Sequence, residues 1–395
     1  MKIKIWKINK LEKICEILDN KRVPISQKDR ISGIYPYYGA SGIVDYIDKY
    51  IFDEELVLIG EDGAKWDAFE NSAFIASGKY WVNNHAHILK PNNEILINKF
   101  LVYFLNYSNL EKYITGATVK KLNQQKLKQI EIPLPPLKEQ ERIVGILDES
   151  FAKIDESIKI LEQNLLNLDE LMQSALQKAF NPLKDNAKEN YKLPQGWEWK
   201  SLGEISNLIQ NGFAASKNNE IPSGYVHLRT HNISTDGNLN FDTLIKIKRE
   251  FIKEKQSFIE KNDILFNNTN STELVGKTAL VTQNYNYAFS NHLTKIKLKN
   301  QYNSKLVVFY FVLLLKNKYF EKICHQWIGQ SGINIDKLKK IQIPLPPLKE
   351  QEQITKHLDF IFEKAKALKE LYTKELKDYE ELKQSLLDKA FKGEL

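Results

Sequence analysis

Two nearly identical segments divide this chain into two similar halves. LKQIEIPLPPLKEQERI occupies residues 127–143 and LKKIQIPLPPLKEQEQI occupies residues 338–354, a constant offset of 211 positions. The same offset continues without a gap to SALQKAF at 174–180 and SLLDKAF at 385–391. Self-similarity of this length indicates a duplicated unit. The chain should therefore contain two copies of one arrangement that end in the same way.

The regions that precede the repeats are less alike but keep a common skeleton. NNHAHILK at 83–90 corresponds to SNHLTKIK at 290–297, and FLVYFL at 100–105 corresponds to VVFYFV at 307–312. The stretch that starts at Trp6 also resembles the one that starts at Trp197. Because the spacings between these blocks differ, the halves are best described as a diverged duplication.

A long helix is predicted after each Pro-Leu-Pro-Pro. About forty residues there contain no proline, and Gly145 is the only internal glycine. Apolar residues recur in the first copy at alternating steps of three and four, namely at Val144, Leu147, Phe151, Ile154, Ile158, Leu161, Leu165, Leu168, Met172, Ala175 and Ala179. The second copy repeats every seven residues at Leu358, Ala365, Tyr372, Tyr379 and Leu386. This heptad pattern predicts that the two helices pair with each other, antiparallel, as a coiled coil.

The prolines that precede each helix predict a stiff, extended joint. They are expected to exclude both helix and strand pairing at Pro133, Pro135, Pro136, Pro344, Pro346 and Pro347. We therefore predict an α+β protein with pseudo-twofold symmetry. Its parts are a first domain at 1–136, a long helix at 137–182, a second domain at 183–347 and a long helix at 348–395.

Positive charge is concentrated outside the predicted helices. Residues 137–180 hold five Lys and Arg against nine Asp and Glu, and residues 348–391 hold nine against ten, a net charge of −5 for both. Since the whole chain carries +7, the remaining residues carry +12. An ordinary lysine-rich surface would explain that surplus, but two similar basic domains on a long spacer favour a duplex nucleic acid with two half-sites.

Composition and cysteine usage indicate a cytoplasmic protein. The hydrophobic share is 42%, and no stretch of eighteen apolar residues predicts a membrane span. The first residues are charged and lack the apolar run of a secretory signal. Cys15 and Cys324 lie in different halves, which argues against a disulfide framework or a metal-binding Cys pair.

The repeated motifs resemble those of the specificity subunits of type I restriction-modification enzymes. The resemblance rests on IPLPPLKEQERI and IPLPPLKEQEQI, each followed by a heptad helix ending in LQKAF or LDKAF, and it covers nearly the whole chain. The family's Leu-Asn-x-x-x-Leu-like step precedes each motif, at Leu122, Asn123 and Leu127 and at Ile333, Asn334 and Leu338.

The resemblance implies two target recognition domains, each reading one part of a split, asymmetric DNA sequence. It also implies two helical regions that space these domains and dock two modification (methyltransferase) subunits and the restriction subunits. Methylation, with S-adenosylmethionine, and cleavage, with ATP, would reside in those other subunits. The chain itself would be non-catalytic and bind no cofactor, and it contains no phosphate loop, dinucleotide fingerprint or Asn-Pro-Pro-Tyr-like string.

Two groups of residues are candidates for a catalytic or metal site. A nuclease-like constellation combines four carboxylates with a lysine, at Asp53, Glu54, Glu61, Asp62 and Lys65. Asparagines replace the needed ligands in the second half, so an acidic surface loop is the preferred interpretation. His85 and His87 lack a third ligand nearby, which favours hydrogen-bonding histidines over a metal site. No metal is therefore predicted.

Candidate base-reading residues in the second half follow strand-like segments. Arg229, His231 and Asn232 follow YVHL, and Asn267 to Ser271 follow DILF. Arg and Asn side chains bind base edges through paired hydrogen bonds, although asparagine is also common in plain turns. The predicted DNA-binding set comprises Arg229, His231, Asn268, Asn270, His292, Gln330 and Ser331.

The first half offers equivalent loops. YPYYGASG at 35–42 contains Tyr37 and Tyr38, and the loop at 60–65 contains Lys65. Thr118, Lys120 and Lys121 precede the terminal motif and are suited to clamping phosphates. The predicted set comprises Tyr37, Tyr38, Lys65, His85, Lys120 and Lys121, with His85 matching His292 as part of a shared Asn-His pair.

The surface of each helix near its start is the predicted modification-subunit contact, with a solvated helix face as the alternative. The residues are Lys138, Glu139, Gln140, Arg142, Lys349, Glu350, Gln351 and Gln353. The rival function is a coiled-coil adaptor with two protein-binding domains, and a nuclease acting alone is a third interpretation. Loss of duplex affinity at moderate salt would favour the adaptor, and metal-dependent cutting by the chain alone would favour the nuclease.

Overall fold

The computed structural model describes residues 6–116, 118–181, 193–252 and 258–395. It divides into two units, Met1–Gln163 with Tyr372–Leu395, and Asn164–Leu371. Each unit contains one β-rich domain and parts of two long helices, which confirms the α+β class. The predicted boundary between residues 182 and 183 lies outside the described residues. Within the described residues no helix is both long and apolar enough to cross a membrane.

The first domain is built on two four-stranded sheets, ordered β2-β9-β6-β7 and β4-β3-β8-β5, and on a separate β1-β10 pair. Its elements are β1 (Lys7–Lys10), β2 (Cys15–Ile17), β3 (Ser32–Gly39), β4 (Gly42–Ile47), β5 (Phe52–Asp53), β6 (Leu56–Gly60), β7 (Ala73–Ala76), β8 (Lys79–Val82), β9 (Ala86–Pro91), α1 (Asn98–Tyr107), α2 (Gln124–Lys128) and β10 (Glu131–Leu134).

The central strand β6 separates two cores. All five of its residues are buried, and successive side chains point to opposite faces. Val57 and Ile59 join the cluster formed with α1, whereas Leu56 and Leu58 join the cluster formed with β8 and β9. The uninterrupted apolar run Leu-Val-Leu-Ile is therefore explained by a strand that is covered on both faces.

The second domain repeats this strand order. Its sheets are β12-β19-β15-β17, β14-β13-β18, β16-β21-β20 and the pair β11-β22. Its elements are β11 (Glu198–Ser201), α4 (Leu202–Ile205), β12 (Ser206–Asn211), β13 (Glu220–Leu228), β14 (Lys246–Ile247), β15 (Ile264–Asn267), β16 (Thr269–Asn270), β17 (Thr278–Leu280), β18 (Ala288–Phe289), β19 (Leu293–Leu298), α5 (Ser304–Lys316), α6 (Tyr319–Ile323), β20 (His325–Trp327), β21 (Gln330–Gly332), α7 (Ile335–Lys339) and β22 (Gln342–Leu345).

The prediction that the prolines before each helix exclude strand pairing was wrong for the first of them. Pro133 lies in β10 opposite Ile8, and Pro344 lies in β22 opposite Trp199. Both strands belong to two-stranded sheets, where the missing N–H group of proline faces away from the partner strand. Only the last two prolines of each motif form the extended joint.

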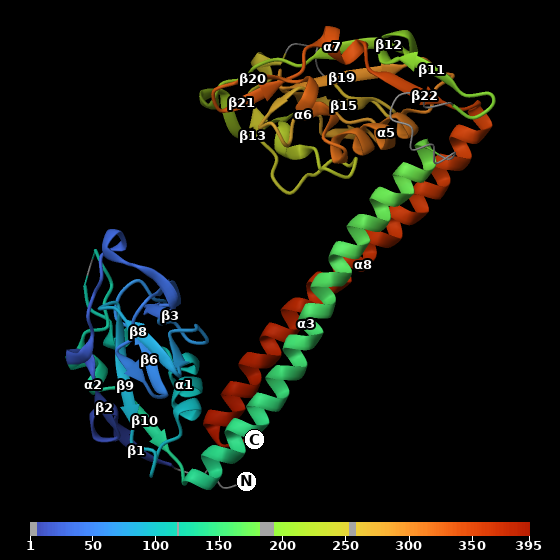
Figure 1. Ribbon diagram of the computed structural model, residues 1–395. Coiled ribbons are helices and arrows are strands. Elements are labelled where there is room, and N and C mark those ends of the chain that lie inside the picture. The colour runs from blue at the N-terminus through green and yellow to red at the C-terminus, as the bar shows by residue number, and fades with distance from the viewer. Residues whose placement is uncertain (1–5, 117, 182–192, 253–257) are drawn as a thin grey trace. The chain divides into compact units, whose positions relative to one another are not determined.

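The helices α3 (Leu137–Phe180) and α8 (Leu348–Lys392) run side by side in opposite directions (Figure 1). In the first unit Lys383 forms an ion pair with Asp155, and in the second unit Lys369 Nζ lies 2.5 Å from Asp169. Both pairs fit one antiparallel register. Several predicted seam residues are buried, namely Leu147, Ile154, Leu161, Leu168, Met172, Leu358 and Ala365.

The predicted seam shifts by one residue at the end of each helix. Leu176 and Leu387 are buried, whereas Ala175 and Leu386 are only half-buried. The shift occurs where the helices pack on a domain as well as on each other. Phe391 contacts Phe100, Phe104 and Tyr107 of α1 at ring distances of 5.0 to 5.4 Å, and Phe180 lies 5.1 Å from Tyr310 of α5. The repeated Ala-Phe ending is therefore a docking element for the helix α1 or α5.

The first turn of each long helix contains a buried glutamine. Gln140 is fully buried, and its amide donates to the carbonyl oxygens of Ile95 and Pro135 and accepts from the Ile97 N–H. Gln351 makes the equivalent bonds to Pro346 and Asn303. The side chain thereby joins the proline segment, the loop before α1 or α5, and the first turn of the long helix.

The buried amide gives a prediction for stability. Gln140→Ala should lower the free energy of unfolding by about 1–3 kcal/mol, because it leaves buried backbone groups without partners. The exposed Gln353 offers a matched control, and Gln353→Ala should change stability by less than about 0.5 kcal/mol. Urea unfolding followed by circular dichroism compares the two, and equal midpoints would contradict the role assigned to Gln140.

Candidate nucleic-acid interface

A groove of about 520 Å³ in the second domain collects several of the predicted residues. Asn268 comes from the β15–β16 turn, His292 from the β18–β19 turn and Gln330 from β21. The complete lining is Asn211, Asn268, Thr269, Asn291, His292, Trp327, Gln330, Gly332, Ile333 and Asn334. Amide and imidazole groups that both donate and accept hydrogen bonds dominate this surface, as recognition of base edges requires.

The hairpin β20–β21 beside this groove has an apolar tip that the sequence reasoning missed. Ile328 is fully exposed and Trp327 is about half-exposed at 53%. Gly329 has a φ of +82°, which allows the two-residue turn between the strands. A Cβ atom on Gly332 would lie only 2.8 Å from the Trp327 ring, so the glycine lets the indole lie against the strand.

Two of the predicted contacts in this domain are buried supports instead. Asn268 donates to the Asn291 carbonyl at 3.0 Å and to Thr294 Oγ1 at 2.9 Å. Ser331 is buried, and its hydroxyl lies 2.8 Å from that of Thr272. Hydrogen bonds within the domain thus occupy the polar atoms of both side chains. Asn270 stays half-exposed between them.

The predicted loop of Arg229 and His231 lies outside the groove. Arg229 is half-buried, donates to the Ala215 carbonyl at 3.2 Å and lies 3.6 Å from Glu220. His231 is exposed. The buried Lys277, which no sequence signal singled out, donates to the Thr230 carbonyl at 2.9 Å, and burial lowers its pKa. Lys277 therefore supports this loop from inside the domain.

At the positions that correspond to this groove, the first domain carries charged residues. The backbones of Asp62 and Lys121 form an isolated β-bridge that corresponds to the β16–β21 pairing. His85 lies in the turn that corresponds to the turn of His292. His85 Nδ1 lies 2.5 Å from Asp62, and Lys121 Nζ lies 2.9 Å from Glu61. The remaining predicted lysines are exposed, with Lys120 3.1 Å from Glu111 and Lys65 3.4 Å from Glu70.

The tyrosines of YPYYGASG do not form an open loop. Tyr37 lies in β3 and is only 1% exposed, and its hydroxyl accepts from the Ile25 N–H at 3.0 Å. Tyr38 is half-buried against Phe74 and Tyr80. Strand alternation turns Tyr37 into the domain. The neighbouring strand β4 instead exposes Ile43, Val44 and Tyr46.

The acidic residues weighed as a nuclease site are paired separately. Asp53 lies 4.0 Å from Lys79, and Glu54 lies 2.6 Å from Lys90. Glu61 is buried between Arg22 and Lys121. No group of three or more His, Cys, Asp or Glu side chains suited to a metal ion occurs in the described parts of the chain.

His87 belongs to a buried polar cluster. It is 0% exposed, with Nδ1 2.6 Å from Asp19 Oδ2 and Nε2 2.6 Å from the Leu122 carbonyl oxygen. Burial alone would raise the pKa of the Asp19 and Glu61 carboxyls, but hydrogen bonds and nearby cations lower it below its usual value. His87 is the main such partner of Asp19, and Arg22 and Lys121 are the main partners of Glu61. The cluster is therefore ionic.

Of the eight residues predicted to contact the modification subunit, six are exposed or partly buried. Lys138, Arg142, Lys349 and Gln353 are exposed, and Glu350 accepts from the Trp197 indole N–H at 3.2 Å. Glu139 is partly buried and binds Arg142 at 2.8 Å. Gln140 and Gln351 are interior joint residues, so the sequence assignment of these two to an outer face is corrected.

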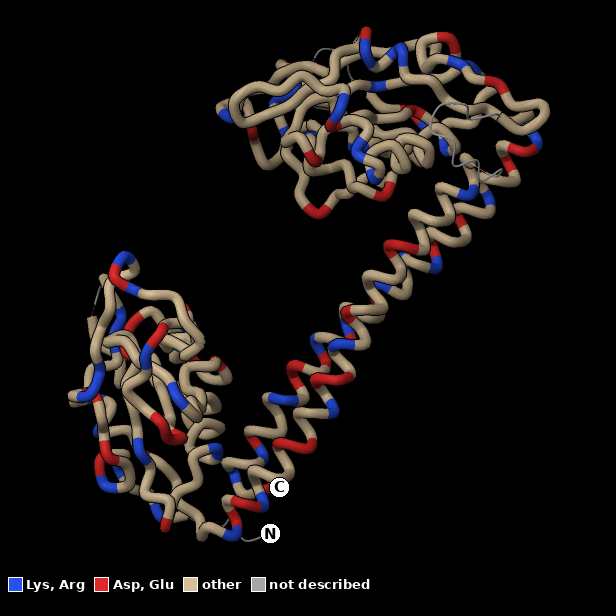
Figure 2. The backbone as a smooth tube through the Cα atoms, viewed as in Figure 1, with Lys and Arg blue, Asp and Glu red and all other residues tan. Residues whose placement is uncertain are grey.

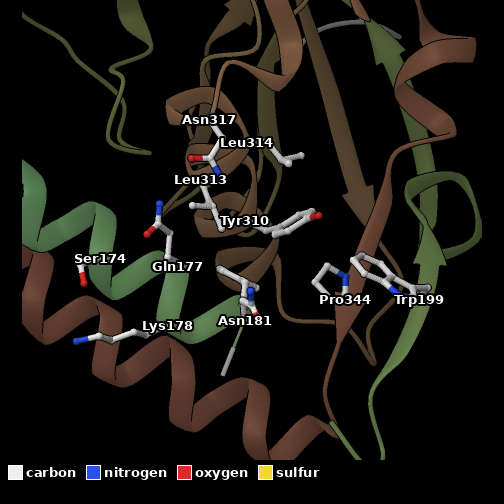
Figure 3. Close-up of a pocket in the computed structure, with 11 residues that line it drawn as sticks. Ser174, Gln177, Lys178, Asn181, Trp199, Tyr310, Leu313, Leu314, Asn317 and Pro344 are labelled. Carbon is white, nitrogen blue, oxygen red and sulfur yellow. The ribbon is translucent and has the colours of Figure 1, made fainter. Parts of the chain in front are cut away.

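A further pocket, of about 580 Å³, lies in the second unit where the end of α3 meets the domain (Figure 3). Gln177 and Lys178 of α3 face it from one side, Tyr310 and Leu313 of α5 from another, and Trp199 near Pro344 from the β11–β22 pair. No sequence motif pointed to this pocket, because its walls come from four separate segments.

Comparison with known proteins gives a family match over most of the chain. The model of the type I restriction modification DNA specificity domain matches residues 3–166 and again 194–377. A putative type I restriction enzyme specificity subunit of Haemophilus influenzae is 31% identical over 362 residues, which covers 90% of this chain and 86% of that protein. The EcoBI specificity subunit of Escherichia coli is 27% identical and covers 88% and 74%.

Solved structures share the fold. A chain from a structure described as the basis of complex assembly and conformational transition of the type I R-M system aligns with a TM-score of 0.73 at 20% identity, covering 99% of both chains. The HsdS subunit from Thermoanaerobacter tengcongensis aligns with a TM-score of 0.55 at 20% identity, covering 99% of this chain and 98% of that chain.

Asn268 and Asn270 provide a test that separates support from contact. Asn268→Ala should lower the unfolding free energy by about 1–3 kcal/mol, because it removes a buried amide from three acceptors. Asn270→Ala should leave stability within about 0.5 kcal/mol but weaken binding to duplex DNA. Urea unfolding and fluorescence anisotropy measure the two effects. Equal loss of stability in both variants would refute the distinction.

Proposed function

The chain belongs to the family of type I restriction modification DNA specificity domains, and from this premise we propose that it reads a split, asymmetric DNA target with one half-site for each domain. The observation that carries this proposal is the difference in side chains between the second domain's groove and the equivalent positions of the first domain. The second domain offers Thr269, His292 and Gly332 where the first offers Asp62, His85 and Lys121. Two scaffolds of one strand order with different side chains suit two different base sequences.

Affinity for DNA would come from the domains rather than the helices. Acidic and basic side chains are mixed along both helices (Figure 2), while the rest of the chain carries the positive surplus. In the first domain the exposed Lys65 and Lys120 are suited to phosphates. In the second domain the apolar tip of Trp327 and Ile328 is suited to contact with thymine methyl groups or sugars.

We assign the two long helices the role of an antiparallel coiled-coil spacer that gives the chain its pseudo-twofold plan. A helix of 44 residues is about 66 Å long, from a rise of 1.5 Å per residue. Such a rod would fix the distance between half-sites, and the hydrogen bonds of the buried glutamine at each joint would restrict rotation of the domain on its helix. The docking side chains that face outward are Lys138, Arg142, Lys349 and Gln353.

In this proposal the chain is non-catalytic and docks two modification subunits as well as restriction subunits. S-adenosylmethionine and ATP would bind to those partners, which would carry out methylation and cleavage. The chain would contribute the choice of sequence to both reactions. Exposed apolar residues near the middle of the helices, Leu166, Leu171, Leu368 and Leu371, support a protein partner there.

The test is to coexpress this chain with the modification subunit encoded beside it and to map adenine methylation by single-molecule sequencing. A split motif should appear only when the chain is present. Replacing residues 193–345 with the equivalent domain of a relative should change one half of that motif and leave the other half intact. If no motif depends on the chain, an adaptor with two protein-binding domains becomes the better account.

The spacer role gives a separate prediction. Replacing Leu161 and Leu165 with lysine should separate the helices and abolish binding to the split target, because charged side chains cannot be buried in the seam. Each domain should remain folded. Lysine at the exposed Ile160 is the matched control and should leave split-site binding unchanged. Unchanged binding in the seam variant would sink the spacer model.

A further inference from the structure

The buried histidine of the first domain donates from both ring nitrogens. Its Nε2 lies 2.6 Å from the carbonyl oxygen of Leu122, and a carbonyl oxygen can only accept. Its Nδ1 lies 2.6 Å from Asp19, whose carboxylate already accepts from the Ile88 N–H and from the Gln124 amide, each at 3.0 Å. Since both neighbours accept, His87 carries two N–H protons and a positive charge.

Other ionic groups lie around this imidazolium. Arg22 donates to Glu61 and to the Ala86 carbonyl, and Lys121 binds Glu61 from the surface side. Two buried carboxylates thus face the buried His87 and two partly buried cations, Arg22 and Lys121. Removal of the second proton of His87 would leave either Asp19 or the Leu122 carbonyl without a donor.

The second domain holds neutral residues at the same three positions. Strand register places Thr294 where His87 lies, because Phe266 faces Thr294 as Ile59 faces His87. Continuation of the same registers places Asn211 at the position of Asp19 and Asn268 at that of Glu61. Thr294 Oγ1 donates to Asn211 Oδ1 at 2.7 Å and lies 2.9 Å from Asn268 Nδ2. No group in this triad titrates near neutral pH.

The ionic cluster lies directly behind the candidate DNA-binding segments of the first domain. Glu61 begins the loop of Asp62 and Lys65, and Arg22 binds the carbonyl oxygens of Asn84 and Ala86 on both sides of His85. His87 binds the carbonyl of Leu122, which follows Lys121 directly. One set of charges thus contacts three separate segments, in addition to the backbone hydrogen bonds that join them.

We propose that His87 is a positioning residue whose second proton holds the three DNA-binding segments of the first domain together, so that reading of the first half-site, but not of the second, is lost at alkaline pH. The proposal rests on the proposed function. The groups that face His87 are Asp19, Arg22 and Glu61, with Lys121, Asp62 and His85 on the surface beside them.

The experiment measures binding of the full chain to three duplexes at several pH values from about 6 to 9.5. One duplex carries the split motif found by methylation mapping, and the other two carry it with one half scrambled. Discrimination against the scrambled first half should fall about tenfold at alkaline pH, as loss of one charged hydrogen bond predicts. Discrimination against the scrambled second half should change less than about twofold.

Variants assign the effect to His87. His85→Gln removes the exposed neighbouring histidine of the candidate surface; it should lower discrimination of the first half-site at every pH, and the remaining discrimination should still fall at alkaline pH. The combined variant Asp19→Asn, Glu61→Asn, His87→Thr, which installs the neutral set of the second domain, should abolish it. Should that variant fail to fold, Asn211→Asp with Thr294→His provides the converse test, since it should confer alkaline loss on the second half-site.

The outcomes separate this inference from the proposed function. Loss confined to the first half-site, retained in His85→Gln and transferred by the converse variant, supports the proposal. Equal loss of both half-sites, or no loss, overturns it while the reading function stands. Absence of discrimination for either half-site at every pH overturns both.

Discussion

The arrangement of each domain on its long helix depends on one buried amide. Gln140 and Gln351 each satisfy backbone groups of the proline joint and of the loop before the domain helix. The two prolines of the joint have no N–H group to donate a hydrogen bond, and the carbonyl oxygen of the first of them is buried. The glutamine therefore supplies a hydrogen bond that neither helix nor strand provides there. This explains why Lys-Glu-Gln-Glu recurs with Pro-Leu-Pro-Pro as one unit: the motif encodes a corner.

The large-scale plan could be predicted because it is written in periodic patterns. The 211-residue offset, the heptad spacing and the absence of proline each act over tens of residues, and the long helices follow from them. Positions that depend on register or packing could not be predicted. Pro133 lies in a strand because its partner strand is on one side only, and Leu176 replaces Ala175 in the seam because a domain helix also packs there.

For the candidate site residues too, repeated patterns could be predicted and positions that depend on packing could not. The Asn-His pairs at His85 and His292 were found because both halves share them, and both lie in exposed turns of the candidate surface. Tyr37, Asn268 and Ser331 have side chains suited to DNA, but strand alternation and turn hydrogen bonds bury them. Trp327 and Ile328 were missed because single apolar residues in a turn form no sequence pattern, and the matching segment of the first half exposes only the smaller Val119 beside Lys120 among its described residues.

The two surfaces can diverge because their backbones are joined by hydrogen bonds that no side chain makes. Glu61 N–H donates to the His85 carbonyl and Leu122 N–H to the Glu61 carbonyl, each at 2.8 Å. In the second domain Asn268 N–H binds the His292 carbonyl at 3.0 Å and Ile333 N–H binds the Asn268 carbonyl at 2.9 Å. The same three segments are therefore connected in both domains whatever the side chains are. An ionic set can replace an amide set behind this framework, and the residues in front of it can change with it, without loss of the fold.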